Sequence, residues 1–471
     1  MQAFVRLLET IDDFLYYPVL LVVLTLAGIY FSFRTKFAQI RLCKEAIRVI
    51  MEHPKDKENV SPFQALMIST ASRVGTGNII GVSTAICLGG PGSVFWMWVL
   101  AILGGASALV ESTLAQIYKC SNPELNQSYG GPAYYIEHAL HSKFIALIFS
   151  IFLIATYAFG FNALCSYNLQ STFSVYSFYD RGTTPLIIGI ILSIIIAWCL
   201  FGGGKRIINV ASVLVPFMGI IYVAVALFIM LKNISVLPLV FKLILRDAFN
   251  FKAILSGVSG SCLIYGIKRG LYSNEAGVGS APNAAAAAYT SHPVKQGLVQ
   301  MLSVYIDTIL ICSATAFICI VYGPGSSLIA GAEYVQLAIR SGLGKYGPLF
   351  ITLAMICFAF TTLIGNLFYI PNALAFINNK KMPGKKFMNV FWVICSLVVL
   401  VGAILPMSAA WALADITMGG MTLINIPSIM LLGGVFFKAL KDYEQQKREG
   451  KDPVFLAKNI GLDPDKLDYW K

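Results

Sequence analysis

An apolar run from about residue 63 to residue 88 is interrupted by the sequence STASRVGTGNIIG, residues 69–81. The run is long enough to cross a bilayer as one helix, yet it contains Arg73, Asn78 and the glycine pair Gly75 and Gly77. Each glycine costs a helix about 1 kcal/mol relative to alanine, and an arginine at membrane depth costs about 3 kcal/mol or more. A helix broken to present N–H and C=O groups to a small polar solute accounts for both costs. The stretch therefore predicts a broken transmembrane helix at a binding site.

The composition indicates a membrane protein throughout. Of the 471 residues, 57% are hydrophobic and 12% are charged, and the mean hydropathy is +0.73. A chain with so little polar surface is expected to be a polytopic α-helical membrane protein, with the lipid bilayer as its solvent. The net charge of +12 comes from basic residues in particular loops, so no nucleic-acid partner is expected. The sequence gives no indication of an oligomeric state.

Eleven apolar segments are candidates for membrane spans. Their approximate ranges are 14–33, 63–88, 93–117, 144–171, 183–201, 207–232, 265–290, 296–322, 347–378, 388–405 and 409–437. Lysines and arginines gather after the first span, near 202–206, near 379–387 and in the C-terminal tail, which lie on one side if the spans alternate. Basic loops face the cytoplasm. The pattern predicts a protein of the bacterial or archaeal inner (plasma) membrane with an external N-terminus and a cytoplasmic C-terminus.

The sequence RVGTGN at 73–78 has a counterpart in EAGVGS at 275–280, and the following spans keep a similar offset. Two units of five helices follow from this repeat, and an odd number of spans forces the units into opposite topologies. Inverted repeats with a broken first helix are the architecture of many secondary transporters. The fold class is therefore an all-α membrane protein of two inverted five-helix repeats with one extra N-terminal helix.

This architecture divides the chain into five parts. They are an N-terminal helix with a basic cytoplasmic segment (1–62), the first repeat (63–232), an external connector (233–264), the second repeat (265–437) and a cytoplasmic tail (438–471). The connector is either an interfacial helix, with Leu243, Phe249, Phe251 and Leu255 dipping into the bilayer edge, or a plain loop. The tail is charged and polar, so we expect it to be solvated and assign it no function.

The first break could bind ions of both signs. Thr76, Gly77 and Asn78 would offer backbone N–H groups to a carboxylate at the start of the second half-helix. The carbonyls of Ala71 and Val74, at the end of the first half-helix, suit a cation. The alternative is that the glycines only allow two helices to pack closely.

Charged side chains at membrane depth are further candidates. Arg73 and Glu275 occupy equivalent repeat positions, where they could form one buried ion pair or each meet a separate partner. Asp307, Glu111 and Asp415 are either functional or partners in helix packing. No catalytic triad, histidine cluster or phosphate loop accompanies them, so the sequence does not predict an enzyme.

Thr361 and Thr362 place two hydroxyls side by side in the ninth span, one turn after the Phe358 carbonyl. Such oxygens are hard ligands that suit Na⁺. A threonine pair in a membrane helix usually bonds back to its own backbone instead, and that alternative is favoured when the pair is considered alone.

Several long segments resemble the alanine-or-glycine:cation symporter family, the sodium:alanine symporter-like group of the amino acid–polyamine–organocation superfamily. They are RVGTGNIIGV (73–82), LGGPGSVFWMWV (88–99), ESTLAQIYK (111–119), KRGLYSNEAGVGSAP (268–282), IDT (306–308) and WALAD (411–415). The resemblance implies a leucine-transporter-type fold and sodium- or proton-coupled uptake of a small neutral amino acid.

The resemblance also implies the positions of the two sites. The sodium site would use the carbonyls of Ala71, Val74 and Phe358 and the hydroxyls of Thr361 and Thr362. The substrate site would use Thr76, Gly77, Asn78, Asn162, Cys165, Leu169, Asn274, Gly277, Gly279 and Asn366. Arg73, Glu275 and Asp307 would be structural or coupling charges.

The chain departs from the family pattern at two positions of interest. Cys165 stands where the family usually has a glutamine, and Asn366 stands where it usually has a tryptophan. Loss of an indole opens volume and adds an amide, which suggests a substrate larger or more polar than alanine, such as glutamine. The alternative is that neither position touches the substrate.

These patterns together predict a secondary active transporter that imports alanine, glycine, serine or glutamine with Na⁺ by alternating access. No cofactor is expected beyond Na⁺ as the coupling ion. The alternatives are proton coupling, for which Asp307 leaves room, and a passive channel, which would need a continuous polar stripe along several spans.

Overall fold

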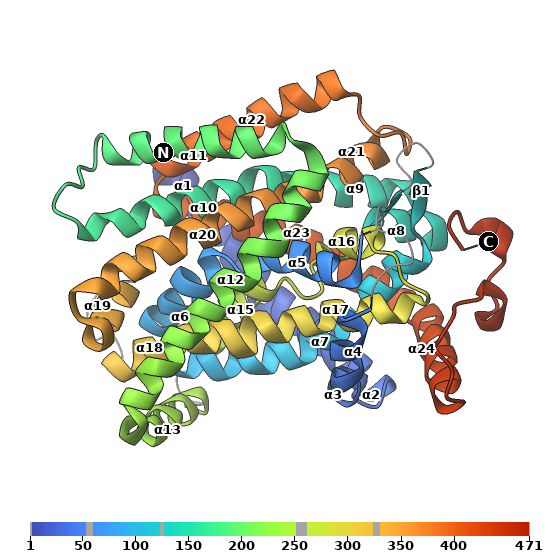
Figure 1. The fold of residues 1–471 in the computed structure, drawn as a ribbon, viewed down its shortest axis with the longest axis horizontal. Helices are drawn as coiled ribbons and strands as arrows, with labels where there is room; N and C mark the ends of the chain where they lie inside the picture. The colour runs from blue at the N-terminus through green and yellow to red at the C-terminus, as the bar shows by residue number, and fades with distance from the viewer. Residues whose placement is uncertain (1, 53–59, 123–126, 251–260, 324–329, 471) are drawn as a thin grey trace.

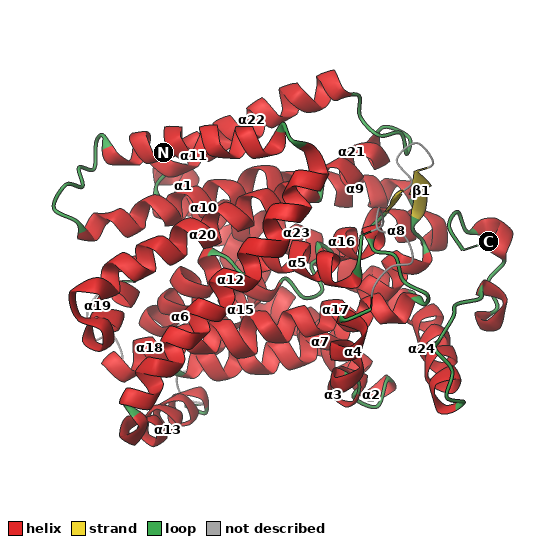
Figure 2. Cartoon of the chain, viewed as in Figure 1, coloured by secondary structure: helices red, strands yellow, loops and turns green. Residues whose placement is uncertain are grey.

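The computed structural model describes residues 2–52, 60–122, 127–250, 261–323 and 330–470. Within these ranges the protein is almost entirely helical (Figure 2). The exception is a two-stranded antiparallel sheet of β1 (Cys120–Asn122) and β2 (Gln127–Tyr129). Most long helices run roughly parallel to the longest axis of the molecule (Figure 1), and the termini lie toward opposite ends of that axis.

The chain begins with a long apolar helical segment, Leu7–Arg34. It consists of α1 (Gln2–Phe14), the π-helical segment η1 (Leu15–Leu20) and α2 (Leu21–Arg34). Two short helices follow, α3 (Ala38–Arg41) and α4 (Cys43–Ile50). The segment α2 packs against α7 of the first repeat, and α1 packs against α23 of the second.

The segment predicted as the first repeat, 63–232, contains helices at the five predicted spans and one further helix, Pro132–Leu140, between the second and third of them. Its elements are α5 (Pro62–Arg73), η2 (Gly77–Gly81), α6 (Val82–Gly89), α7 (Gly92–Ile117), α8 (Pro132–Leu140), α9 (Lys143–Ile154), η3 (Ala155–Gly160), α10 (Phe161–Ser171), η4 (Thr172–Val175), α11 (Thr184–Leu200) and α12 (Gly203–Lys232). The interruption between α5 and η2 coincides with the predicted break.

The second repeat follows the same plan. Its elements are α15 (Cys262–Asn274), α16 (Ala281–Ala287), α17 (Pro293–Tyr305), η6 (Ile306–Cys312), α18 (Ser313–Tyr322), α19 (Ala332–Leu343), η7 (Gly344–Tyr346), α20 (Gly347–Phe368), α21 (Ile370–Ile377), α22 (Lys385–Ile404) and α23 (Met407–Leu431). The chain between α15 and α16 is not helical and lies at the second predicted break.

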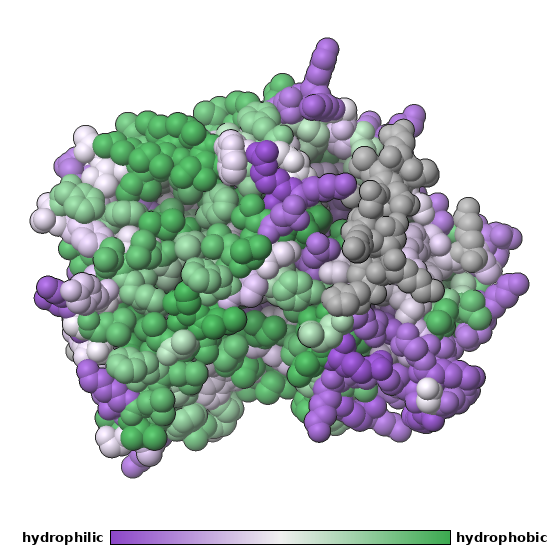
Figure 3. All heavy atoms as spheres, in the orientation of Figure 1, coloured by the Kyte–Doolittle hydropathy of each residue, from purple (hydrophilic) through white to green (hydrophobic). Residues whose placement is uncertain are grey.

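Eight helices in the described ranges are long and apolar enough to cross a membrane. The 17-residue helix α11 is shorter, and each of the two broken segments, 62–89 and 262–287, combines short helices. On the face shown in Figure 3, hydrophobic side chains cover most of the surface away from the C-terminus, and hydrophilic ones gather at the end that carries it. The protein is thus a multi-pass membrane protein, for which eleven crossings remain a prediction.

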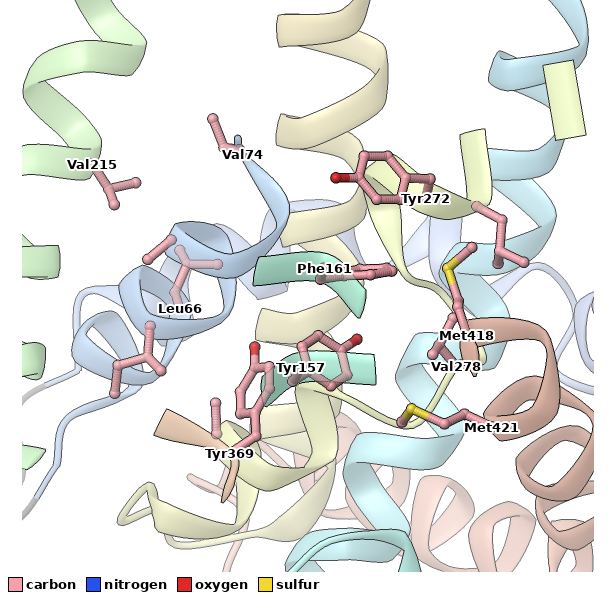
Figure 4. Packing of buried hydrophobic residues seen from close by; sticks show 14 of the residues in the cluster. Leu66, Val74, Tyr157, Phe161, Val215, Tyr272, Val278, Tyr369, Met418 and Met421 are labelled. Carbon is pink, nitrogen blue, oxygen red and sulfur yellow. The ribbon is translucent and has the colours of Figure 1, made fainter. Parts of the chain in front are cut away.

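The two repeats are interleaved in the core. Helix α7 packs along α15 and α17, α5 lies between α12 and α20, and α11 lies along α22. The buried rings of Tyr369, Tyr157, Phe161 and Tyr272 form a series of contacts in the core, with Tyr272 and Phe161 nearer than the other two to Val74 in Figure 4. Each half therefore positions the broken helix of the other.

The connector contains the helix α13 (Leu237–Ala248). Its buried residues Val240, Ile244 and Ala248 share one face, because they recur every four residues. Asp247 anchors the helix to the start of α7, since its Oδ2 accepts from the Gly92 amide (2.7 Å). Interfacial placement stays a prediction, and 251–260, which includes two of the predicted membrane-facing residues, lies outside the described ranges.

The prediction of a solvated C-terminal tail is wrong in part, because residues 448–452 are exposed while later apolar residues are buried. After α24 (Gly433–Arg448), Trp470 donates from its indole nitrogen to the Gln116 carbonyl (2.7 Å). The ammonium group of Lys119 lies 3.8 Å from the centre of the Tyr469 ring. The tail follows the ends of α7 and α17 because Phe455, Leu467 and other apolar side chains are buried there.

Candidate functional site

The first break is stabilised by side chains rather than by helical hydrogen bonds. Ser61 and Gln64 form a capping box at the start of α5, which fixes where this helix begins. The helix ends at Arg73, and the Asn78 side chain accepts from the Gly75 amide (2.7 Å). Asn78 therefore replaces a helical partner and holds the chain in its broken form.

The two glycines of the first break allow close approaches to neighbouring helices. A Cβ atom at Gly75 would overlap the Thr362 hydroxyl of α20, and one at Gly77 would lie 2.6 Å from the Tyr272 ring of α15. These contacts agree with the packing alternative for the glycines. They also place Thr362 directly against the end of the first half-helix.

Two of the predicted cation residues, Ala71 and Thr362, lie where α5 and the chain just after it contact α20. A Cβ atom at Gly365 would lie 3.0 Å from the Ala71 carbonyl carbon, so the two helices are in close contact here. Val74 is fully buried beside them. The Thr361 hydroxyl bonds back to the carbonyls of Cys357 (3.0 Å) and Phe358 (3.1 Å), as isolated threonines in helices do.

Thr362 behaves differently from its neighbour. Its hydroxyl is buried and has no hydrogen-bond partner among the described residues. An unpaired buried polar group costs about 1–3 kcal/mol. Because the last carbonyls of a helix also lack intrahelical donors, the end of α5 and Thr362 together form a group of oxygens suited to a cation.

The second break is closed by protein groups. Glu275 has a left-handed backbone (φ 50°), and its carboxylate accepts from Ser72 (3.3 Å), Tyr157 (2.8 Å) and Ser280 (2.5 Å). This arrangement satisfies the buried charge with three hydroxyl groups from three segments of the chain. The carboxylate also joins the two breaks, since Ser72 lies in the last turn of α5.

The glycines of the second break have left-handed conformations, with φ 82° at Gly277 and φ 92° at Gly279. The Gly277 amide donates to Glu111 (3.3 Å), and Asn425 donates to both the Gly277 carbonyl (2.9 Å) and Glu111 (2.7 Å). A Cβ at Gly279 would lie 2.8 Å from the Phe149 ring. Neither glycine lies at the Thr76–Gly77 surface of the first break, so the predicted substrate set does not form one cluster.

Arg73 and Glu275 do not form an ion pair with each other. The Arg73 guanidinium instead donates to the Gln300 carbonyl (3.3 Å) and to the Ser303 hydroxyl, both on α17. Of the two alternatives drawn from the sequence, the structure has the one in which each charge meets its own partners. The reason is that hydroxyls of three segments surround Glu275, while α17 presents acceptors to Arg73.

Asp307 connects the two breaks through η6. Its carboxylate accepts from Asn78 (2.7 Å), Ser273 (2.7 Å) and Thr308 (2.9 Å). Asn274 donates to the same threonine (3.2 Å). Since Asn78 belongs to the first broken helix and Ser273 to the second, Asp307 couples the positions of both.

The remaining predicted substrate residues come from α10 and α20. The Asn366 amide donates to Asn162 (2.9 Å), and its Oδ1 shares the single hydrogen of the Ser72 hydroxyl (2.6 Å) with Glu275, so both ends of this amide have protein partners. Cys165 is buried with its thiol 3.5 Å from the Ala359 carbonyl. Leu169 is buried in the same helix. The packing alternative for Asn366 is consistent with this geometry.

Two groups that the sequence reasoning missed complete the site. Asn168 donates to the Thr76 hydroxyl (3.0 Å). Arg269 pairs with Asp415 (2.7 Å) and lies 3.8 Å over the Trp411 ring, which in turn packs 4.9 Å from Tyr272. The cost of a charge inside an apolar span, which identified Arg73, would also have identified Arg269.

A model of the sodium:alanine symporter family matches residues 1–457. The probable sodium/glutamine symporter GlnT of Bacillus subtilis (strain 168) is 41% identical over 465 residues, which cover 98% of this chain and 94% of GlnT. The sodium/alanine symporter AgcS of Methanococcus maripaludis is 34% identical over 460 residues, which cover 95% of this chain and 99% of AgcS.

Two solved structures share the architecture. MhsT in complex with L-phenylalanine has a TM-score of 0.53 at 14% identity and covers 87% of this chain and 96% of its own. A Na⁺-coupled sialic acid symporter has a TM-score of 0.51 at 15% identity and covers 96% of this chain and 94% of its own. The fold is therefore of the leucine-transporter type. The family model and the two relatives, together with this fold, show that the chain is a membrane transporter and not an enzyme. It is a member of the sodium:alanine symporter family.

Proposed function

We propose that this protein imports a small neutral amino acid of the alanine, glycine, serine or glutamine class together with Na⁺ by alternating access. Relatives named as sodium/alanine and sodium/glutamine symporters support both the substrate class and the ion. The two broken helices, each packed into the opposite repeat, support movement of one helix group against another.

The observation that carries this proposal is the Thr362 hydroxyl. It is buried without a partner in the described protein and faces Gly75, just after the open end of α5. A helix C-terminus presents partial negative charge, so an uncharged hydroxyl together with carbonyl oxygens suits a monovalent cation. Na⁺ would take the carbonyls of Ala71, Val74 and Phe358 with the hydroxyls of Thr361 and Thr362.

The substrate would bind on the other side of the same break. The Asn78 amide bonds the Gly75 carbonyl (3.2 Å), so the amides of Thr76 and Gly77 at the start of the half-helix are the ones that would bind the carboxylate of an amino acid. Tyr272 and Phe161, whose ring centres are 4.8 Å apart, would exclude water from this position. Inward movement of one positive charge with the substrate gains about 2.3 kcal/mol per 100 mV of membrane potential.

The test is uptake of labelled alanine and labelled glutamine into proteoliposomes with and without an inward Na⁺ gradient. We expect uphill accumulation that requires Na⁺. Accumulation driven equally well by a proton gradient alone would contradict Na⁺ coupling and direct attention to Asp307. Downhill flux that ignores both gradients would contradict symport and favour a passive channel.

The competition between alanine and glutamine tests the substrate class. Glutamine uptake that equals or exceeds alanine uptake would support a role of Cys165 and Asn366 in opening the site. Glycine and alanine far ahead of glutamine, serine and asparagine would contradict that role. The hydrogen bonds of Asn366 to Ser72 and Asn162 would then be its only function.

We also propose an external N-terminus and a cytoplasmic C-terminus. Basic side chains of α4 and α24 lie at the end of the molecule that carries the tail (Figures 1 and 3), which supports that end as cytoplasmic. Labelling of single cysteines in intact cells with a membrane-impermeant reagent tests this orientation. Reaction of a tail cysteine from outside would contradict it.

A further inference from the structure

We propose that Asn168 selects amino acids whose side chains carry a hydrogen-bond donor. It would do so at the base of a cavity that leads toward the first break. This inference deepens the proposed function and rests on it, because it assumes an amino acid as the transported solute. The residue belongs to α10 and was not among the candidates drawn from the sequence.

The cavity lies at the end of the molecule opposite the C-terminal tail. It has a volume of about 650 Å³ and is lined by the ends of α10, α22, α19 and α23 and by Ile80 of η2. In the proposed orientation this end is external (Figure 1). Arg181 and Glu333 bring one charge of each sign to the lining, which suits a zwitterion on its way to the break.

Asn168 lines this cavity and is fully buried by the surrounding chain. Its Nδ2 donates to the Thr76 hydroxyl (3.0 Å), which fixes the orientation of the amide. Its Oδ1 has no hydrogen-bond partner among the described residues. A buried amide oxygen without a partner is unfavourable, and a ligand that supplies a donor would remove this cost.

Other amides near the break are already occupied. Asn78 bonds the Gly75 amide and Asp307, and Asn366 bonds Ser72 and Asn162. Asn162 has an unpaired Nδ2 but is not among the residues that line the cavity. Asn168 therefore combines three properties: a free acceptor, a place in the cavity wall and a direct bond to the first break.

The chemistry of a free acceptor determines the class of substrate. A carboxamide or hydroxyl side chain can donate to Oδ1, whereas the side chains of alanine and glycine cannot. A site with a buried polar group rejects analogues that leave this group unpaired. We therefore expect Asn168 to favour glutamine, asparagine and serine over alanine and glycine, with Thr76 transmitting the contact to the broken helix.

The test measures KM and kcat for labelled glutamine and alanine in proteoliposomes with an inward Na⁺ gradient. Asn168→Ala should lower kcat/KM for glutamine about 10- to 100-fold and that for alanine less than about threefold. Asn168→Asp keeps an acceptor oxygen and should retain more of the preference for glutamine. Asn233→Ala, at the C-terminal end of α12, is the matched control and should change neither substrate.

The possible outcomes separate the inference from the proposed function. Equal losses for both substrates in Asn168→Ala would overturn the inference, because a residue that only positions Thr76 affects every substrate alike. An unchanged preference in Asn168→Ala, or a wild-type protein that takes up alanine but not glutamine, would also overturn it while Na⁺-coupled uptake stands. Absence of Na⁺-driven accumulation of either amino acid by the wild-type protein would overturn the proposed function and this inference with it. The melting temperature of each variant in detergent identifies those that fail to fold.

Discussion

The two broken helices have similar sequences but opposite states of hydrogen bonding. At the second break, Gly277 has protein partners on both its amide and its carbonyl, and Glu275 accepts three hydroxyl groups. At the first break, the Thr362 hydroxyl and the Asn168 amide oxygen remain unpaired although both are buried. The repeat thus supplies a break twice with different backbone geometry, since Glu275, Gly277 and Gly279 are left-handed and no residue of 73–78 is, and the unpaired oxygens lie at the first break.

This difference suggests a division of roles. A break whose polar groups are paired within the protein is stable without a ligand, because its buried groups are satisfied. A break that keeps unpaired groups gains stability when a ligand pairs them. We infer that the second break holds the two repeats together, with Glu111 and Asn425 as its anchors, and that the first break binds the ion and the substrate.

The largest expected effect concerns the space at the first break. Gly75→Ala would place a methyl group on the Thr362 hydroxyl, which leaves no room for a cation there. We expect Na⁺-driven uptake to fall about 100-fold or more, because the methyl group fills the position proposed for the ion, and overpacking by itself costs about 1–3 kcal/mol. The measurement is initial uptake rate in proteoliposomes. Gly434→Ala, where a Cβ meets no atom within 4 Å, is the control, and full activity of Gly75→Ala would remove the first break from the cation site.

The unpaired hydroxyl at the first break gives the next largest effect. Thr362→Val keeps the shape of the side chain and removes only its oxygen, so the Na⁺ concentration for half-maximal uptake should rise about 10- to 100-fold. Thr422→Val is the matched control, because the Thr422 hydroxyl bonds the Met418 carbonyl of its own helix (2.9 Å). An unchanged Na⁺ dependence in Thr362→Val would show that the two breaks do not differ in cation binding.

The second break should respond in stability rather than in ion affinity. Glu111→Leu removes the acceptor of the Gly277 amide and of Asn425, which leaves two buried donors unpaired at about 1–3 kcal/mol each. We expect a melting temperature several degrees lower in detergent and a half-maximal Na⁺ concentration within about threefold of the wild-type value. Glu111→Gln keeps an acceptor and should lose less. A large change in Na⁺ affinity without destabilisation would assign ligand binding to the second break as well.

The smallest effect is expected at the neighbour of Thr362. Thr361→Val removes a hydroxyl that already bonds the carbonyls of Cys357 and Phe358, so its removal should change the half-maximal Na⁺ concentration less than about threefold. The measurement is uptake as a function of Na⁺ concentration for Thr361→Val and Thr362→Val, which compares their half-maximal Na⁺ concentrations. Equal shifts in both variants would mean that the Thr361 hydroxyl gives up its bonds to the Cys357 and Phe358 carbonyls in order to bind the ion.

Much of the fold could be predicted from the sequence because the signals are local. The end of α5 and the start of α16 follow from the glycine-containing breaks predicted at 73–78 and 275–280, and the family resemblance is confirmed by the family model. Parts of the candidate site were harder to predict from the sequence. Asn168 carries no unusual cost in a helix, so nothing in its local sequence marked it, whereas Arg269 carried such a cost and was overlooked.

The tail shows why polarity alone is a weak guide to position. Residues 441–453 are mostly charged and polar, which predicts solvation. The apolar side chains of Phe455, Leu467 and Trp470 come later, and they pack against the helix ends or near them. A few such residues suffice to dock a chain of this length, because each buried side chain contributes about 1.5–3 kcal/mol.

The sequence by itself determined the membrane class, the two breaks and the family, because the cost of glycine or of charge in an apolar helix depends only on the local sequence. The tertiary structure alone decided which groups meet. Arg73 bonds α17 rather than Glu275, Asp307 joins the two breaks, and Thr362 is unpaired while Thr361 is not. These outcomes depend on the packing of helices that are distant in the chain, since a buried polar group bonds whatever partner that packing places within reach.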